Sequence, residues 1–493
     1  MLTPLFYSCQ EFGSVCQYNP LPQTTVPSLP QRPAGDPVPI QPRFGLQFMP
    51  NPSTSIISNE AEGRYFRLFH EELAFDLCGN FETPFWSRLV PQECHHEPAI
   101  KHAIFALSAL YKSAISSKIP TANTDNHHLN FAMVQQSKAI KLLREALSDG
   151  RPQMRLALVA SLLFGCFESF HGSWETATQQ IYSGINILKS LQEDERERAT
   201  AGLPTIDLEL GLTLGRLKMQ IISFLAMSPR CAHPSNDSED EEIKGGMDIP
   251  DRFSTLNEAF VSATSLATSI LRHSRTSARF RDVAGHWDSI ARQQQCLDGL
   301  LDRWNEAYEP FFLSASENTA SREYLGALQL RICIWKCEIM IATSMFDEEA
   351  VFDNFTVQFQ RITYYARHLL KRDNEIRESD GPRVQYGIAL IMSLFYTATR
   401  CRDFFVRREA IAILREWPCT NGVCHSLQAA KVAEWIVGIE ESSCGGNGFI
   451  REECRVRMKS LKVVLQKDLI IVECMQPSVD GSLELRQVNL PWP

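Results

Sequence analysis

Pairs of cysteines and histidines are the residues of this chain whose types and spacing could support metal chemistry. Cys333 and Cys337 are four residues apart, so a helix would place both thiols on one face beside Glu338. A tetrahedral zinc site needs four ligands, and no second cysteine pair lies nearby in the sequence, so we predict buried thiols there. The dipeptides that contain histidine lack the spacing of a metal site and are predicted to be surface or capping residues: His95-His96, His127-His128 and Cys424-His425.

The signature motifs of phosphate-loop, dinucleotide, serine-hydrolase and zinc-protease sites are absent from the sequence. An acidic run at residues 236–242 would suit magnesium and a diphosphate in an all-helical enzyme if its carboxylates shared a helix face. It stands between Pro234 and the pair Gly245-Gly246, which predicts a solvated loop instead. We therefore predict a protein that is not an enzyme, and an all-helical enzyme remains the weaker alternative.

The charges of the chain do not favour a nucleic-acid-binding surface. Lys and Arg number 49 against 58 Asp and Glu, a net charge of −9, so no global basic field is present. The densest basic segment is interleaved with Asp403, Glu409 and Glu416, which predicts a solvated or salt-bridged helical face rather than a phosphate track. Its arginines are Arg400, Arg402, Arg407, Arg408 and Arg415.

Helical periodicity runs through most of the chain and predicts an all-α fold, a large irregular domain of many helices. Residues 155–170 repeat apolar side chains at helical spacing and predict a central core helix; their apolar run of 12, 156–167, is too short to span a membrane. Gly172 is predicted to take the left-handed conformation that ends this helix, and Glu168 to cap the helix near its end. Gly184, inside the next helix, predicts a close approach of a neighbouring backbone. Residues 462–472 show some strand alternation, and we expect a helix there.

The first 50 residues differ in composition from the rest of the chain, because they hold ten of the 26 prolines. Such a stretch fixes too many backbone torsions for helix or sheet, which predicts a disordered, extended arm over residues 1–63. The helical domain is expected over 64–475, and a tail over 476–493. Residues 1–15 lack the basic and uninterrupted apolar parts of a signal peptide, and the 15 cysteines are scattered, so we expect an intracellular protein with reduced thiols.

Three segments of the sequence resemble the regulatory region of fungal binuclear zinc-cluster transcription factors. They are residues 96–191, which include LALVASLLFGCFESFHGSWETATQQIYSGINILKSL; 249–260, IPDRFSTLNEAF; and 395–458, which include FYTATRCRDFFVRREAIAILREWP and AKVAEWIVGIEE. Their order and spacing are similar to the family over roughly residues 64–475. The resemblance implies a regulatory-core motif made of Cys166, Glu168, Gly172, Gly184, Arg402 and Glu440.

The DNA-binding head of that family holds two zinc ions with six cysteines, and this sequence departs from it. Cys9 and Cys16, with six residues between them and Gly13 four after the first, are similar to the last loop of such a head. Two thiolates cannot close even one tetrahedral zinc site. We therefore expect no cofactor in this chain, with zinc present only if the protein has an N-terminal head beyond this sequence. Cys9 and Cys16 are weak metal candidates, or a vestige of the cluster at residues 9–16.

The resemblance implies transcription regulation in the nucleus, with the cytoplasm as a second compartment, and control of a fungal metabolic or secondary-metabolite gene set. It implies protein partners, either the transcription machinery or a sister zinc-cluster factor, and it allows a small-molecule effector. No membrane role is expected, and DNA binding stays open. The main alternative is a headless coregulator that binds proteins and no DNA.

Overall fold

The computed structural model describes the chain from residue 59 onward, with gaps. The chain divides into a unit of Met1–Thr54 and a unit of Ser55–Pro493, and the description covers the second unit. The predicted proline-rich arm, with Cys9 and Cys16, therefore lies outside the described residues, apart from positions 59–63. The described ranges are 59–81, 84–116, 125–148, 154–198, 205–225, 247–280, 286–376, 383–384, 390–421, 424–442, 450–464, 469–477 and 482–491.

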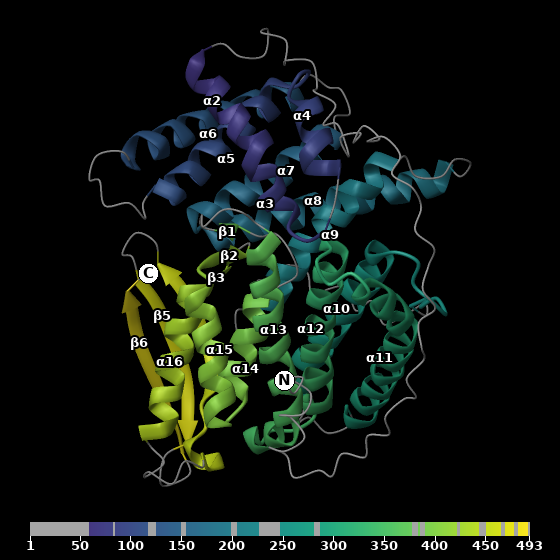
Figure 1. Cartoon of the computed structure of the whole chain (residues 1–493), viewed down its shortest axis with the longest axis vertical. Helices are drawn as coiled ribbons and strands as arrows, with labels where there is room; N and C mark the ends of the chain where they lie inside the picture. The colour runs from purple at the N-terminus through teal and green to yellow at the C-terminus, as the bar shows by residue number, and fades with distance from the viewer. Residues whose placement is uncertain are drawn as a thin grey trace, which may run out of the picture. The chain divides into compact units, whose positions relative to one another are not determined.

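Helices make up most of the described residues, as the sequence predicts (Figure 1). The first group contains α2 (Glu60–Leu68), η1 (Phe69–Leu73), α3 (Ala74–Cys78), η2 (Phe85–Leu89), α4 (Val90–Glu93), α5 (Pro98–Ser116), α6 (Asp125–Ser148), α7 (Met154–His171), α8 (Trp174–Arg198) and α9 (Thr205–Leu225). The side chain of Asn59 caps α2 by accepting a hydrogen bond from the Glu62 backbone N–H at 2.9 Å. Pro98 stands at the start of α5, as expected of a residue that has no N–H to satisfy.

The second group begins after residue 246 and contains α10 (Leu256–Phe280), α11 (Trp287–Ser316), α12 (Arg322–Thr343), η3 (Glu349–Phe355), α13 (Thr356–Ile376), α14 (Leu390–Arg400), α15 (Phe404–Glu416) and α16 (Ser426–Ser442). Two N-terminal side-chain caps show how the local sequence determines where these helices begin. Ser321 accepts from the Tyr324 N–H at 3.0 Å at the start of α12, and Asp403 accepts from the Phe405 and Val406 N–H groups at the start of α15.

The C-terminal residues form a sheet, and the expected helix at residues 462–472 is wrong. After η4 (Glu452–Cys454) come β4 (Arg457–Val464), β5 (Leu469–Pro477) and β6 (Leu483–Pro491), which pair antiparallel in the order β4-β5-β6. Alternate residues of β5 are buried, Ile470, Val472 and Cys474 among them, so one face of the sheet covers the helical core. The segment expected to be a tail, 476–493, contains β6. A second, very small sheet joins β1 (Arg383–Val384), β2 (Cys419–Asn421) and β3 (Cys424–His425).

The helix predicted to be central is buried, which confirms its role in the core. Alone among the described helices, α7 is long and apolar enough to cross a membrane by length and composition, yet 67% of it is buried inside the protein. It packs against α5, α8 and α9. A second apolar cluster, built around Phe253, Phe260, Trp304 and Tyr308, joins α10, α11 and α12.

Candidate functional site

The turn between α7 and α8 holds the first part of the predicted regulatory-core motif. Cys166 is fully buried, and Gly172 has a φ of 86°, the left-handed conformation that favours glycine. The Gly172 N–H donates to the Ser169 carbonyl, and the Ser173 N–H donates to the Glu168 carbonyl at 2.8 Å. This pair of bonds is a Schellman motif, so the predicted helix stop at Gly172 is confirmed.

Glu168 and Gly184 take different roles in the same helix pair. Glu168 is half-buried near the end of α7, and burial raises the pKa of its carboxyl, opposed by the charge of His171 and a hydrogen bond with Ser173. A Cβ placed on Gly184 would lie 2.4 Å from Ser161 Oγ and 3.1 Å from a methyl carbon of Leu214. Gly184 therefore allows the close approach of α7 and α9 to α8 that its position in a helix predicts.

Arg402 and Glu440, the second part of the motif, meet in a buried ion pair. Arg402 Nη2 lies 2.8 Å from Glu440 Oε1, and Arg407 Nη2 lies 2.7 Å from Glu440 Oε2. Glu440 Oε1 also accepts the Val456 backbone N–H at 2.9 Å. The exposed fractions of the side chains are 3% for Arg402 and 0% for both Arg407 and Glu440. One carboxylate thus links the α14–α15 junction, α15, α16 and the segment before β4.

A second buried carboxylate extends this network to η3. Glu349 pairs with Arg400 and lies 3.1 Å, oxygen to Nη1, from Arg402. Burial raises the pKa of Glu349, but the positive charges of Arg400 and Arg402 outweigh it, so the pKa is lowered overall. The Glu349 backbone N–H in turn donates to Glu452 at 2.8 Å.

Arg455 is buried and joins the network through its planar guanidinium group. Its Nη1 and Nη2 donate to the two carboxylate oxygens of Asp353 at 2.9 and 2.6 Å, and its Nε donates to the Ile450 carbonyl at 3.0 Å. The Arg455 side chain is 1% exposed. A bidentate pair of this kind fixes orientation as well as charge, so it fixes the position of η3 against the segment that leads into β4.

The two arginines that share Glu440 differ in their electrostatic balance. Burial lowers the pKa of Arg402, but Glu440 and Glu349 together raise it above its ordinary value. Among the described residues, Glu440 is the one carboxylate in direct contact with Arg407, and Arg402 repels it, so burial prevails and the pKa of Arg407 is lowered. Arg407 Nη1 is also buried without a hydrogen-bond partner. Arg407 is therefore the member of the network that depends most on Glu440.

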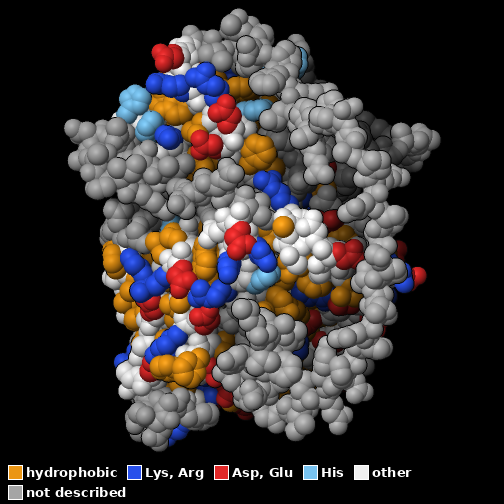
Figure 2. Space-filling view, in the orientation of Figure 1, with side chains coloured by type: hydrophobic (Ala, Val, Ile, Leu, Met, Phe, Trp, Pro, Cys, Tyr) orange, Lys and Arg blue, Asp and Glu red, His pale blue; other side chains and the backbone are white. Residues whose placement is uncertain are grey.

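The predicted basic segment is salt-bridged, as expected, but part of it is core rather than surface. Arg408 pairs with Glu441 at 2.6 Å and Arg415 with Glu434 at 2.6 Å near the surface. Figure 2 shows basic and acidic side chains interleaved over the region of α13, α15 and α16. Arg402 and Arg407 are buried instead, so these two arginines are not part of the predicted solvated face.

The remaining sequence candidates take structural positions. Cys333 and Cys337 lie in the apolar core of α12 as buried thiols, as predicted. His95 and His96 are exposed, and His425 caps α16 by accepting the Leu427 N–H at 3.1 Å. Among the described residues no group of three or more His, Cys, Asp or Glu side chains could hold a metal ion.

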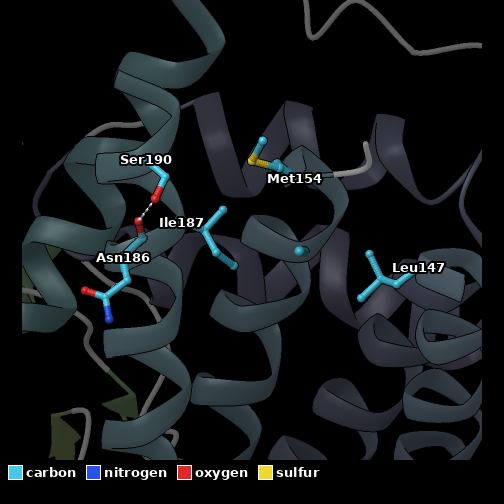
Figure 3. Close-up of a pocket in the computed structure, with 6 residues that line it drawn as sticks. Leu147, Met154, Asn186, Ile187 and Ser190 are labelled. Carbon is cyan, nitrogen blue, oxygen red and sulfur yellow. Dashed lines mark hydrogen bonds between the residues drawn. The ribbon is translucent and has the colours of Figure 1, made fainter. Parts of the chain in front are cut away.

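A shallow hollow of about 320 Å³ lies between the end of α6, the start of α7 and α8 (Figure 3). It is lined by Leu147, Met154, Ala157, Asn186, Ile187 and Ser190. The Ser190 hydroxyl is already occupied, because it donates to the Asn186 carbonyl at 3.2 Å. None of the six described residues that line the hollow is ionisable, so they do not offer the converging acids or histidines that the enzyme alternative requires.

Comparison with known protein families gives a match within the first helical group. Residues 64–201 match the fungal specific transcription factor domain. The match runs from within α2 to just beyond α8 and includes the four motif residues of α7, α8 and the turn between them. The resemblance seen in the sequence is thereby confirmed over these residues, and no zinc-cluster domain was found. No curated protein and no solved structure matches the chain. The matched domain indicates a transcription regulator and favours that class over an enzyme.

Glu349, Asp353 and Arg455 are the members of the network that sequence reasoning missed. Asp353 and Arg455 are 102 residues apart, and Glu349 and Arg400 are 51 apart, so no local spacing connects them. The one available signal was the CRVRM segment at 454–458, which the family resemblance includes and which contains Arg455.

Proposed function

We propose that this protein regulates the transcription of a fungal metabolic gene set, such as secondary-metabolite genes, and acts in the nucleus through protein partners. The observation that supports the proposal is the match of residues 64–201 to the fungal specific transcription factor domain. That match indicates transcription regulation and implies a nuclear role. The gene set and the partners are the finer parts of the proposal.

The packing of the second helical group supports regulation by a two-state body. Glu440 and Glu349 hold η3, the α14–α15 junction, α16 and the segment before β4 together through buried charges. Displacing Glu440 would leave the buried Arg407 uncompensated, so intermediate arrangements of this network would be costly. A ligand or protein that prefers one arrangement then shifts the population between states.

A small-molecule effector is part of this proposal, and the hollow of Figure 3 is its candidate site. The hollow is shallow, and its volume of about 320 Å³ lies at the lower end of the ~300–1,000 Å³ range of ligand pockets. The apolar side chains of Leu147, Met154 and Ile187 suit an uncharged, largely apolar compound.

A complete zinc site is not found among the described residues, because no group of three or more His, Cys, Asp or Glu side chains there could hold a metal ion. Cys9 and Cys16 supply only two thiolates. We therefore propose that the purified chain carries no structural zinc and reads DNA only through a partner. Metal analysis is expected to give well below one zinc per chain, and a stoichiometric two zinc ions would contradict this part of the proposal.

The experiment that tests the gene set compares transcripts in three fungal strains. One lacks the protein, one expresses the wild-type chain, and one expresses a matched level of the Glu440→Gln variant. Loss of the chain is expected to change a set of metabolic genes together, with recovery by the wild type and less recovery by the variant. An unchanged transcript profile, or changes confined to other cellular functions, would refute the proposed gene set.

The partner is tested by recovering the tagged chain from nuclei and identifying what copurifies. We expect a component of the transcription machinery or a zinc-cluster factor in the recovered material. Tight binding of the purified chain alone to a defined duplex would contradict action through partners and favour a DNA-binding protein.

A further inference from the structure

The strand β6 is an exposed edge of the C-terminal sheet. It pairs with β5 along its whole length, from Leu483 against Pro477 to Pro491 against Leu469. Within the described residues no strand pairs with its other side. Alternate backbone N–H and C=O groups of an edge strand point away from the sheet, so β6 presents a row of groups that a further strand can bond.

The other edge of the same sheet is protected, and β6 is not. β4 carries Arg457 and Lys459, and its register against β5 shifts between Met458 and Ser460. Positive charges and a bulge are devices by which proteins prevent strands from adding to an edge. The contrast between the two edges indicates that pairing at β6 is tolerated or used.

Between Leu483 and Leu490 the register of β6 against β5 is unbroken, without the shift found in β4. The single arginine of β6 is balanced by a single glutamate, and its proline stands at the far end. Leu483 and Leu485 are 50% and 47% exposed, and Leu485 lies opposite Met475 of β5 on the outward face. Two exposed leucines therefore lie on the outward face of β6, beside the open edge.

The order of charges in β6 is self-complementary about Leu485. If a second β6 pairs antiparallel with its centre at Leu485, Glu484 faces Arg486 of the second copy, and the reverse pair forms by symmetry. Leu485 then faces the same residue of the second copy. In the single chain Glu484 and Arg486 pair along one strand at 3.0 Å, with side chains 46% and 52% exposed.

Neighbouring registers are disfavoured by the same residues. A centre at Glu484 or at Arg486 would place like charges directly opposite each other. A centre at Gln487 would place Arg486 against Val488, which leaves both charges without an opposite charge across the strands. In the Leu485 register β6 pairs from Leu483 against Gln487, so Pro491, which has no N–H to donate, stays outside the pairing.

We propose that two copies of this chain join through their β6 strands, antiparallel and centred on Leu485, so that one sheet continues across both copies. This inference goes beyond the proposed role in transcription and does not depend on it. The pairing is isologous, because the same strand supplies both sides of the contact.

The test measures the mass of the full chain in solution by light scattering at tens of micromolar. The wild type is expected at twice the chain mass of 55.9 kDa. Glu484→Arg alone and Arg486→Glu alone each create like-charge pairs and are expected at the single-chain mass. The double variant restores opposite charges across the strands and is expected to return to the dimer mass.

Lys459→Glu on the protected β4 edge is the matched control and is expected to leave the dimer mass unchanged. Amide hydrogen exchange of the wild type gives a readout that needs no variant, because exchange in residues 483–488 should slow as the protein concentration rises. A single-chain mass for the wild type, a dimer that both single inversions leave intact, a double variant that stays monomeric, or exchange independent of concentration would each overturn the proposal.

Discussion

Replacing Glu440 with glutamine tests the buried network most sharply, because a single atom of this side chain is exchanged while its shape is kept. The carboxylate of Glu440 is fully buried and contacts Arg402 at 2.8 Å, Arg407 at 2.7 Å and the Val456 N–H at 2.9 Å. The amide cannot neutralise either arginine, and its NH₂ group would be directed at one donor. Glu349 still compensates Arg402, so Arg407 is left as an isolated buried cation.

The expected loss of unfolding free energy is about 3–5 kcal/mol, the range for breaking a buried ion pair by removing one partner. Domains of ordinary stability unfold at a cost of roughly 5–15 kcal/mol, so this one change removes a large share of the total. Equilibrium urea unfolding, followed by circular dichroism, measures the difference. A cycle with Arg407→Met isolates the coupling of the pair, expected at roughly 0.5–3 kcal/mol for residues in contact.

Glu434→Gln is the matched control, since it removes a carboxylate from the same helix at a more exposed pair with Arg415, whose side chain is 58% exposed. We expect it to cost no more than about 1 kcal/mol. The reasoning is refuted if Glu440→Gln costs no more than Glu434→Gln, because burial and shared coordination would then add nothing.

Three further outcomes follow from the site. Gly184→Ala should destabilise the chain by about 1–3 kcal/mol through overpacking against Ser161. Adding Ser161→Ala should recover part of that loss in the same urea assay. Fully additive changes in unfolding free energy would contradict the contact. Glu349 has a lowered pKa, so its contribution is present above its ordinary value of about 4.3 and is lost as the pH falls through the lowered one. Glu349→Gln should therefore flatten the acid limb of stability against pH, and an unchanged limb would count against it. Glu168 has a pKa raised by burial, so its charge opposes folding at neutral pH. Thermal melts of Glu168→Gln should show a midpoint no lower than the wild type at pH 7, and a clear decrease would show that the carboxylate is stabilising.

Helices could be predicted from the sequence because their signals are local. The apolar period of α7, Pro98 at the start of α5 and Gly172 at the end of α7 each report on a few neighbouring residues. The close approach at Gly184 was also predictable, since a glycine inside a helix carries a stability cost that packing must offset.

The C-terminal sheet was missed because its strands do not alternate cleanly. Residues 469–472, LIIV, form a continuous apolar run, and periodicity cannot assign such a run to helix or strand. The β-branched content of this run, Ile470, Ile471 and Val472, was the better guide, because these side chains favour a pleated, half-buried surface.

The buried network could be predicted only in part. The family resemblance named Arg402 and Glu440, and the structure brings them together, but nothing in the local sequence separates Arg407, which is buried, from Arg408, whose side chain is 40% exposed. Burial of a charged residue is decided by partners far along the chain. Here those partners are Glu440, 33 residues from Arg407, and Glu349, 51 residues from Arg400.

The central claim, that this helical protein regulates transcription, is tested most directly by tethering it to a promoter. The full chain is fused to an unrelated DNA-binding head in a fungal cell, and reporter RNA is measured against the head alone. We predict a several-fold change in reporter RNA with the wild-type fusion and a smaller change with Glu440→Gln than with Glu434→Gln. Reporter RNA equal to that of the head alone, with the folded fusion present in the nucleus and bound at the promoter, would contradict the account.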